Sequence, residues 1–211
     1  MADPSSPPAL LPLFPIRGCI LLPGEALPLN VFEPRYLNML DDCRSADGWL
    51  GIIQPADGGA RENPELEPVG CAGRLASFQE TEDGRYLIVL QGVQRFELEG
   101  ESDEPRPYRL GKAEYARFAD DERAEREDVR VEPGFIALMK RYFDHAGLQA
   151  DWDSLERAPI GMIADKVAMA APFAPPAKQA LLEAKDCAAR IRVLGELVEE
   201  ALNPTGRTGA V

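Results

Sequence analysis

Four closely spaced prolines in an apolar N-terminal stretch constrain this chain more than any other feature of its sequence. Residues 10–40 read LLPLFPIRGCILLPGEALPLNVFEPRYLNML, with prolines at positions 12, 15, 23 and 28 among large aliphatic residues. Proline cannot donate a hydrogen bond to a neighbouring strand, so it is rarely found inside a central strand. The stretch therefore predicts short edge strands with fixed bends, and at least one edge near residues 10–32 that stays open or is capped only by a loop.

A helix is predicted directly after these strands. Apolar and other residues alternate over residues 27–31, which is the period of a strand. Pro34 suits the first position of a helix, because the amide hydrogen that it lacks would have no partner there. Apolar residues from Tyr36 to Leu40 then recur at helical spacing, and the helix is expected to end near Arg44.

The middle of the chain carries further strands. Apolar patterns predict strands over residues 49–53, 69–80, 86–90, 93–98 and 108–118, with a hairpin turn at Glu82-Asp83-Gly84. Gly92 is expected to break the strand pattern. Residues 55–68, PADGGARENPELEP, contain two adjacent glycines and three prolines, and they predict a surface loop.

The last third of the chain is predicted to be helical. Residues 119–130 read ADDERAEREDVR, a charged run typical of a linker or of a solvated helix start. Helical periodicity then predicts helices that begin near Pro133, Pro159, Pro175 and Asp186, the last of them ending at Asn203-Pro204. We therefore expect a β-rich module over residues 10–118, a linker over 119–130 and a helical module over 131–203.

The charge balance narrows the possible functional classes. The chain has 36 Asp and Glu against 23 Lys and Arg, which gives a formal net charge of −13. This charge repels phosphate backbones and anionic membrane surfaces, and the sequence has no basic patch to offset it. The N-terminus lacks the basic region of a signal peptide, and no apolar run is long enough to span a membrane. We expect a cytoplasmic protein that binds neither nucleic acid nor membranes.

The cysteines do not form a metal-binding pattern. They stand at positions 19, 43, 71 and 187, without a C-x-x-C pair, and His145 is the single histidine. Zinc sites need clustered thiolates or imidazoles. We expect reduced, free thiols, no bound metal and no cofactor.

No catalytic arrangement stands out in the sequence. Ser154 and Lys166 are the residue types of a Ser–Lys pair, but no nucleophile-turn motif accompanies them. His145 suits the C-terminus of a helix, where positive charge is favoured. The acidic runs Asp41-Asp42 and Asp120-Asp121-Glu122 are more typical of solvated faces than of a cation site. The sequence predicts no catalytic residue.

The predicted helix start offers the best candidate for a binding site. Glu33 and Arg35 could clamp a peptide terminus or an acidic side chain, although a helix start with locally paired neighbours is the simpler interpretation. Nearby aromatic and apolar residues could partly line a groove, although aromatics at regular spacing usually belong to a core. The candidate peptide-binding residues are Phe32, Glu33, Arg35, Tyr36, Met39 and Trp49.

Several segments together resemble a known family. The stretch LPLFPIRGCILLPGEALPLNVFEPRYLNML is followed in order by VGCAGRL, DGRYLIVLQGVQRFELE and PYRLGKAEY, and this series resembles the N-terminal, substrate-recognition domain of Lon proteases. The segment from Pro159 to Glu200 is similar to the helical part of that region, most specifically in KQALLEAKD. The resemblance covers about residues 10–202. It implies an α+β fold, with a PUA-like bent sheet or pseudo-barrel that holds one helix, followed by a C-terminal helical bundle.

The resemblance also implies a function in binding. No G-x-x-x-x-G-K-[ST] phosphate loop occurs, so we expect a stand-alone Lon N-terminal domain protein without the ATPase and protease modules. The predicted function is non-enzymatic binding of unfolded or extended polypeptide, with a second copy of the chain as another partner for an open strand edge. The alternatives are a hydrolase, by the family name, and a nucleic-acid binder, by analogy with other PUA-like folds.

Overall fold

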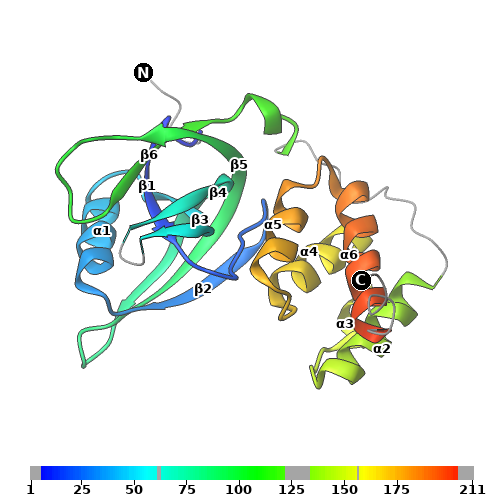
Figure 1. The fold of residues 1–211 in the computed structure, drawn as a ribbon. Coiled ribbons are helices and arrows are strands. Elements are labelled where there is room, and N and C mark those ends of the chain that lie inside the picture. Colours follow the sequence, from blue (N-terminus) through cyan, green and yellow to red (C-terminus); the bar gives the residue numbers. More distant parts are fainter. Residues whose placement is uncertain (1–5, 61–62, 122–133, 156, 204–211) are drawn as a thin grey trace. The chain divides into compact units, whose positions relative to one another are not determined.

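The structure, a computed structural model, describes residues 6–60, 63–121, 134–155 and 157–203. The chain divides into two units (Figure 1). We call Met1–Arg123 with Pro172–Leu182 the sheet unit, and Ala124–Ala171 with Glu183–Val211 the helix unit. The segment 172–182 differs from the expected organisation, because it belongs with the sheet and not with the other helices. Most of the predicted 119–130 linker lies outside the described residues.

Six strands form one sheet that closes on itself. They are β1 (Leu10–Pro15), β2 (Ala26–Val31), β3 (Trp49–Ala60), β4 (Asn63–Glu80), β5 (Tyr86–Glu101) and β6 (Arg109–Glu114). Their order is β2-β5-β4-β3-β1-β6, and the second half of β5 also pairs with β6. The long strand β5 thus closes a ring of five strands, and β2 is added outside that ring (Figure 1). The predicted bent sheet or pseudo-barrel is confirmed.

Strand β1 is an interior strand, although its prolines predicted an edge. It pairs with β6 over Leu10–Leu13, and in parallel with β3 over Leu13–Pro15. The two partners are staggered, so Pro12 registers only with β6 and Pro15 only with β3. Each proline has a partner strand on one side alone, which leaves room for a residue without an amide hydrogen. The edge prediction is wrong for β1 for this reason.

The predicted surface loop over residues 55–68 is also wrong. Strands β3 and β4 run through it as a long hairpin, in which Pro55 registers with Leu66 and Gly59 with Pro64. The register shifts between these pairs, so some residues stay without a direct partner. The glycines and prolines therefore mark irregularities within a strand ladder, and not the end of the ladder.

Strand β5 continues through Gly92, where a break was expected. Gly92 registers with Gly73 of β4, and a Cβ atom at position 92 would lie only 2.2 Å from the carbonyl oxygen of Leu22. Glycine is required because the backbone before β2 packs directly on this strand. The strand predicted to reach residue 118 instead ends at Glu114, and the 3₁₀ helix η1 (Ala116–Phe118) follows it.

Helix α1 (Pro34–Ser45) begins at Pro34, as predicted. One face of it is buried, where the ring of Tyr36 lies 4.3 Å from the ring of Phe14, measured between centroids. The core behind the helix is a cluster of aliphatic and aromatic side chains from five strands. Its buried members are Leu11, Leu13, Trp49, Ile53, Ala72, Phe96 and Ala113.

Helix α5 (Pro175–Glu183) belongs with the sheet because of buried amide contacts. The side chain of Gln54 in β3 donates to the side-chain oxygen of Gln179 at 3.0 Å and to the carbonyl of Pro175 at 3.1 Å. The side chain of Gln179 in turn donates to the carbonyl of Val69 in β4 at 3.1 Å. Buried amides are costly unless they are paired, so these bonds hold the helix in one position on the sheet.

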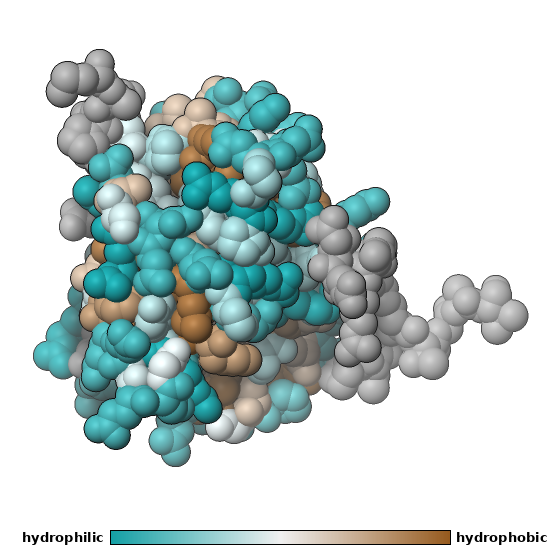
Figure 2. Space-filling model, turned by 90° about the vertical axis from the view of Figure 1, so that its left-hand side faces the viewer, coloured by the Kyte–Doolittle hydropathy of each residue, from teal (hydrophilic) through white to brown (hydrophobic). Residues whose placement is uncertain are grey.

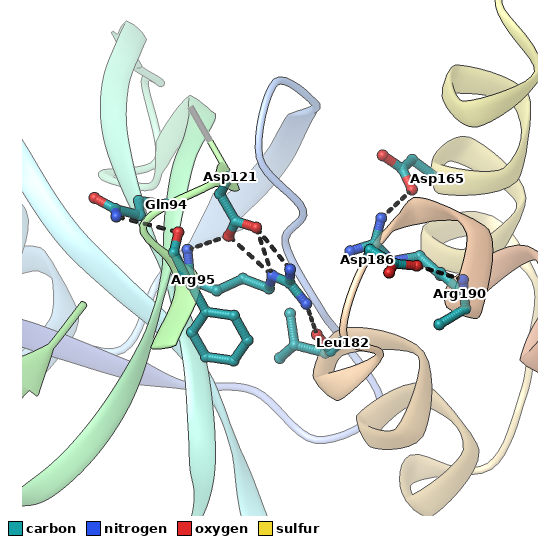
Figure 3. A network of polar contacts seen from close by, with 9 residues as sticks. Gln94, Arg95, Asp121, Asp165, Leu182, Asp186 and Arg190 are labelled. Atoms are coloured by element: carbon teal, nitrogen blue, oxygen red, sulfur yellow. Dashed lines mark hydrogen bonds and ion pairs between the residues drawn. The ribbon is translucent and has the colours of Figure 1, made fainter. Parts of the chain in front are cut away.

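The helix unit contains α2 (Phe135–Ala146), α3 (Trp152–Leu155), α4 (Ile160–Ala170) and α6 (Cys187–Leu202). Asp186 caps α6 as predicted, because its side chain accepts a hydrogen bond from the amide of Ala189 at 2.7 Å. A buried ion pair joins two of these helices, with Arg190 Nη1 lying 2.7 Å from Asp165 Oδ1 (Figure 3). The helices predicted to begin near Pro133, Pro159 and Asp186 are confirmed as α2, α4 and α6, whereas the short helix α3 was not predicted.

Candidate functional site

The six candidate peptide-binding residues fall into two groups in the structure. The exposed group is Phe32, Glu33 and Arg35, at the start of α1. The buried group is Tyr36, Met39 and Trp49, all less than a tenth exposed. Tyr36 and Met39 lie on the buried face of α1, and Trp49 belongs to the core cluster. The buried group therefore has a clear packing role.

Glu33 and Arg35 pair with each other. The Nε and Nη2 atoms of Arg35 donate to one carboxylate oxygen of Glu33 at 3.1 and 3.0 Å, and the guanidinium lies over the ring of Tyr36. Both side chains are about half exposed, so water weakens the ion pair. The pairing of Glu33 with Arg35 agrees with the simpler interpretation offered by the sequence, a helix start with locally paired neighbours. Phe32 is then the one apolar residue of the exposed group.

Strand β2 presents an open backbone edge. The amide of Gly92 in β5 donates to the carbonyl of Glu25 at 2.9 Å. In an antiparallel pair, the backbone N–H and C=O groups of every second residue point to the partner strand. Counting from Glu25, the backbone groups of Leu27 and Leu29 point to β5, and those of Pro28 point away from it. Proline there removes no hydrogen bond from the sheet. No strand pairs with the outer edge of β2 among the described residues.

Two exposed apolar side chains accompany this edge. Phe32 follows β2 directly and is 64% exposed, and Leu87, which is 40% exposed, registers with Asn30. Along β2 itself, half-buried residues alternate with exposed ones. An extended polypeptide beside β2 would meet unpaired backbone groups and apolar side chains together. We call residues 26–32 together with Leu87 the β2 edge.

A cavity of about 380 Å³ lies at the other end of α1. We call it the α1 cavity. Its wall combines the last turn of α1, the starts of β1 and β3, and the segment that leads into β6. Figure 2 views the molecule from the side of α1 and shows apolar surface in narrow strips between hydrophilic side chains.

A polar network shapes the wall of the α1 cavity. The hydroxyl of Tyr108 donates to Oδ2 of Asp42 at 2.6 Å, and Nη1 of Arg106 donates to the same oxygen at 2.9 Å. Burial, together with the hydrogen bond to Asp42, raises the pKa of Tyr108 to about 12. Burial and the charge of Asp42 also raise the pKa of the Cys43 thiol to about 12. Both groups therefore stay neutral near neutral pH, and the thiol is a poor nucleophile.

A buried lysine lies within the sheet unit. Burial lowers the pKa of Lys178 in α5 to about 8, against a smaller opposite effect of Cys19. Burial also raises the pKa of the Cys19 thiol. The charged form of the lysine is disfavoured at this position, so Lys178 bears on the stability of the fold.

Of the remaining sequence candidates in the described part of the chain, His145, Ser154 and Lys166 lie on three different helices. His145 lies in the last turn of α2, as expected, and Lys166 is exposed on α4. Nothing in the described part of the chain groups three His, Cys, Asp or Glu side chains for a metal ion. The four cysteines are free thiols. Of the helices in the described ranges, none has the length and apolar character needed to cross a membrane.

The comparisons with known proteins agree on one family. A sequence model of the ATP-dependent protease La (LON) substrate-binding domain matches residues 10–200. The chain is 30% identical over 220 residues to Lon protease 2 of Sorangium cellulosum, and 26% identical over 202 residues to Lon protease 2 of Myxococcus xanthus. These matches cover 95% and 90% of this chain, but only 26% and 24% of the relatives. The chain therefore spans about a quarter of the length of these curated relatives.

Solved structures show the same fold. The Lon N-terminal domain protein from Xanthomonas campestris matches with a TM-score of 0.61 and 23% identity, over 90% of this chain and 97% of that one. The N-terminal domain of the Mycobacterium avium complex Lon protease matches with a TM-score of 0.61 and 17% identity, over 90% and 98%. The predicted α+β fold class and the predicted family are confirmed.

Proposed function

We propose that this chain, which belongs to the family of ATP-dependent protease La (LON) substrate-binding domains, is a non-enzymatic module that binds unfolded or extended polypeptide. The observation that carries the proposal is the β2 edge, where the outer side of β2 has no partner strand among the described residues and lies beside the exposed side chains of Phe32 and Leu87. A substrate-binding domain needs a surface that accepts many sequences, and backbone hydrogen bonds at a strand edge do not depend on sequence.

The chemistry of the β2 edge supports a polypeptide partner. An added strand would pair with the outward backbone groups of Ala26 and Asn30, while Pro28 offers only an acceptor. Apolar side chains of the added strand would cover Phe32 and Leu87, so burial would drive much of the binding. The net charge of −13 disfavours a nucleic acid as the partner. Four free thiols fit a reducing, cytoplasmic setting.

A peptide titration tests the proposal. We would measure the fluorescence anisotropy of a labelled, uncharged peptide of about ten residues in which leucine alternates with serine. The expected dissociation constant is about micromolar, because ordering the peptide opposes much of the contact free energy. Moderate salt should change it little. The peptide should be intact afterwards by mass spectrometry, since no catalysis is proposed.

Two variants locate the binding surface. Asn30→Pro removes an outward amide of β2, and Phe32→Ser removes the apolar side chain, so each should weaken binding by about tenfold. Ala76→Ser is the control, because Ala76 is also exposed but lies on β4, outside the β2 edge. Equal affinity of all four proteins, or salt-sensitive binding of a labelled RNA in place of the peptide, would contradict the proposal.

A further inference from the structure

We propose that the α1 cavity takes up the side chain of a lysine or arginine from a bound polypeptide. This inference deepens the proposed function and rests on it for the polypeptide context. The cavity lies at the C-terminal end of α1, whereas the β2 edge ends at the N-terminus of the same helix. The two surfaces are therefore separate, about 18 Å apart along a helix of this length.

The wall of the cavity suits a long aliphatic stem. Leu10, Pro12, Trp49 and Leu110 provide its apolar part, and Trp49 is anchored from behind as a member of the core cluster. Lysine and arginine bury their methylene groups along such surfaces while the charged end remains among polar groups. A volume of about 380 Å³ accommodates one such side chain together with water.

The charges around the cavity select a cation. Three carboxylates line it, from Asp42, Asp47 and Glu104, against the single guanidinium of Arg106. Asp42 is engaged, since it accepts from both Arg106 and Tyr108. Among the residues that the structure describes, Asp47 and Glu104 form no ion pair within 4.0 Å. Two carboxylates thus remain to pair with an incoming positive charge.

The end of α1 adds to this preference. Ser45 and Ala46, in the last turn of α1 and just beyond it, line the cavity, and the amide of Ala46 is directed back to the carbonyls of Asp42 and Cys43. The C-terminus of a helix carries a partial negative charge, which favours a cation nearby. An anionic or phosphate-bearing ligand would be repelled by the helix end and by both free carboxylates.

Nuclear magnetic resonance titration with small probes tests this site. The probes are Nα-acetyl-lysine methylamide and its uncharged counterpart Nα-acetyl-norleucine methylamide, added to the ¹⁵N-labelled full chain. The lysine probe should shift the indole signal of Trp49 and the amide of Gly48 with a dissociation constant of about 1 mM. The indole of Trp152, which lies in the helix unit, is the internal control. The norleucine probe should bind at least about fivefold more weakly.

Charge-neutral variants identify the selecting groups. The double variant Asp47→Asn, Glu104→Gln should lose the preference for lysine over norleucine, while Glu82→Gln, an exposed turn residue, should keep it. Equal binding of both probes to the natural chain, or no shift at Trp49, would overturn the inference. The titration does not involve the β2 edge, so a failure of peptide binding there and a failure at this cavity can be told apart.

Discussion

Arg95 and Asp121 form a forked ion pair inside the sheet unit. Nη2 of Arg95 lies 2.6 Å from Oδ1 of Asp121, and Nε lies 2.9 Å from Oδ2 (Figure 3). The side chain of Arg95 is 2% exposed and that of Asp121 is 9% exposed. Nη1 of Arg95 also donates to the carbonyl of Leu182 at 2.8 Å. One arginine of β5 thus fixes both the segment after η1 and the end of α5.

Asp121→Ala is expected to destabilise the fold by about 3 to 5 kcal/mol, because it leaves a buried guanidinium without its charge partner. Urea unfolding followed by circular dichroism measures this loss. Asp120→Ala is the control and should cost less than about 0.5 kcal/mol, since Asp120 is exposed. The double variant Arg95→Met, Asp121→Ala should regain part of the stability. Similar losses for Asp120→Ala and Asp121→Ala would contradict the importance of the pair.

Gly92→Ala is expected to cost about 2 to 4 kcal/mol, because the new Cβ would collide with the carbonyl of Leu22 at 2.2 Å. Gly195→Ala is the matched control. No atom lies within 4 Å of a Cβ at Gly195 in α6, and alanine in a helix should stabilise by about 0.5 to 1 kcal/mol. Thermal unfolding should show a lower melting temperature for Gly92→Ala and a higher one for Gly195→Ala. An unchanged melting temperature of Gly92→Ala would contradict the close contact between Gly92 and the carbonyl of Leu22.

Lys178→Met is expected to stabilise the chain near neutral pH by about 1 to 3 kcal/mol, since it removes a charge that burial disfavours. The native lysine loses its proton near pH 8, whereas the unfolded chain keeps its proton up to about pH 10.5. The unfolded state then binds more protons, so the stability of the natural chain should rise with pH above about 8, towards that of the variant.

Urea unfolding of both proteins between about pH 7 and about pH 9 checks this convergence. The upper limit matters because the pKa of Cys19 is raised from 9.0, and titration of that thiol lowers stability at higher pH. Stability curves that stay parallel over this range would show that Lys178 keeps its ordinary pKa.

Tyr108→Phe is expected to cost about 1.5 to 3 kcal/mol, because the hydroxyl donates to a charged Asp42. The pKa of Tyr108 is raised, so the contribution of the hydroxyl is complete below pH 10, and is lost as pH rises from 10 through about 12. The difference in stability between the natural chain and the variant should therefore shrink in this range. Denaturant unfolding at neutral and alkaline pH measures it, and a constant difference would count against the Asp42–Tyr108 bond.

Helix starts were predictable from local chemistry. Pro34 begins α1, Asp186 caps α6, and each expectation depended on only a few neighbouring residues. Strand positions were less predictable where prolines and glycines occurred. Pro12 and Gly92 each meet a requirement set by a distant partner, the stagger of β3 and β6 in one case and the backbone of Leu22 in the other. A single sequence does not contain that partner information.

The candidate site was predictable only in part. Phe32 was named from the sequence and is the most exposed apolar residue of the β2 edge. Asp42 and Tyr108 are 66 positions apart, so their hydrogen bond and the α1 cavity beside it required the closed sheet to be known. Asp121 was expected on a solvated face, and that expectation is wrong because Arg95 draws its carboxylate inward.

The assignment of Pro172–Leu182 to the sheet unit has a consequence for how the chain can be cut. The polypeptide leaves the sheet unit after Arg123, returns to it for α5, and leaves again. A fragment that ends within residues 119–130 would lack Gln179 and Leu182, and so would lose a side-chain acceptor of the Gln54 amide and the backbone acceptor of Arg95 Nη1. Cleavage of one peptide bond within residues 119–130 would instead leave two fragments held together by these contacts. The two fragments would elute as one species in size-exclusion chromatography until a denaturant separates them.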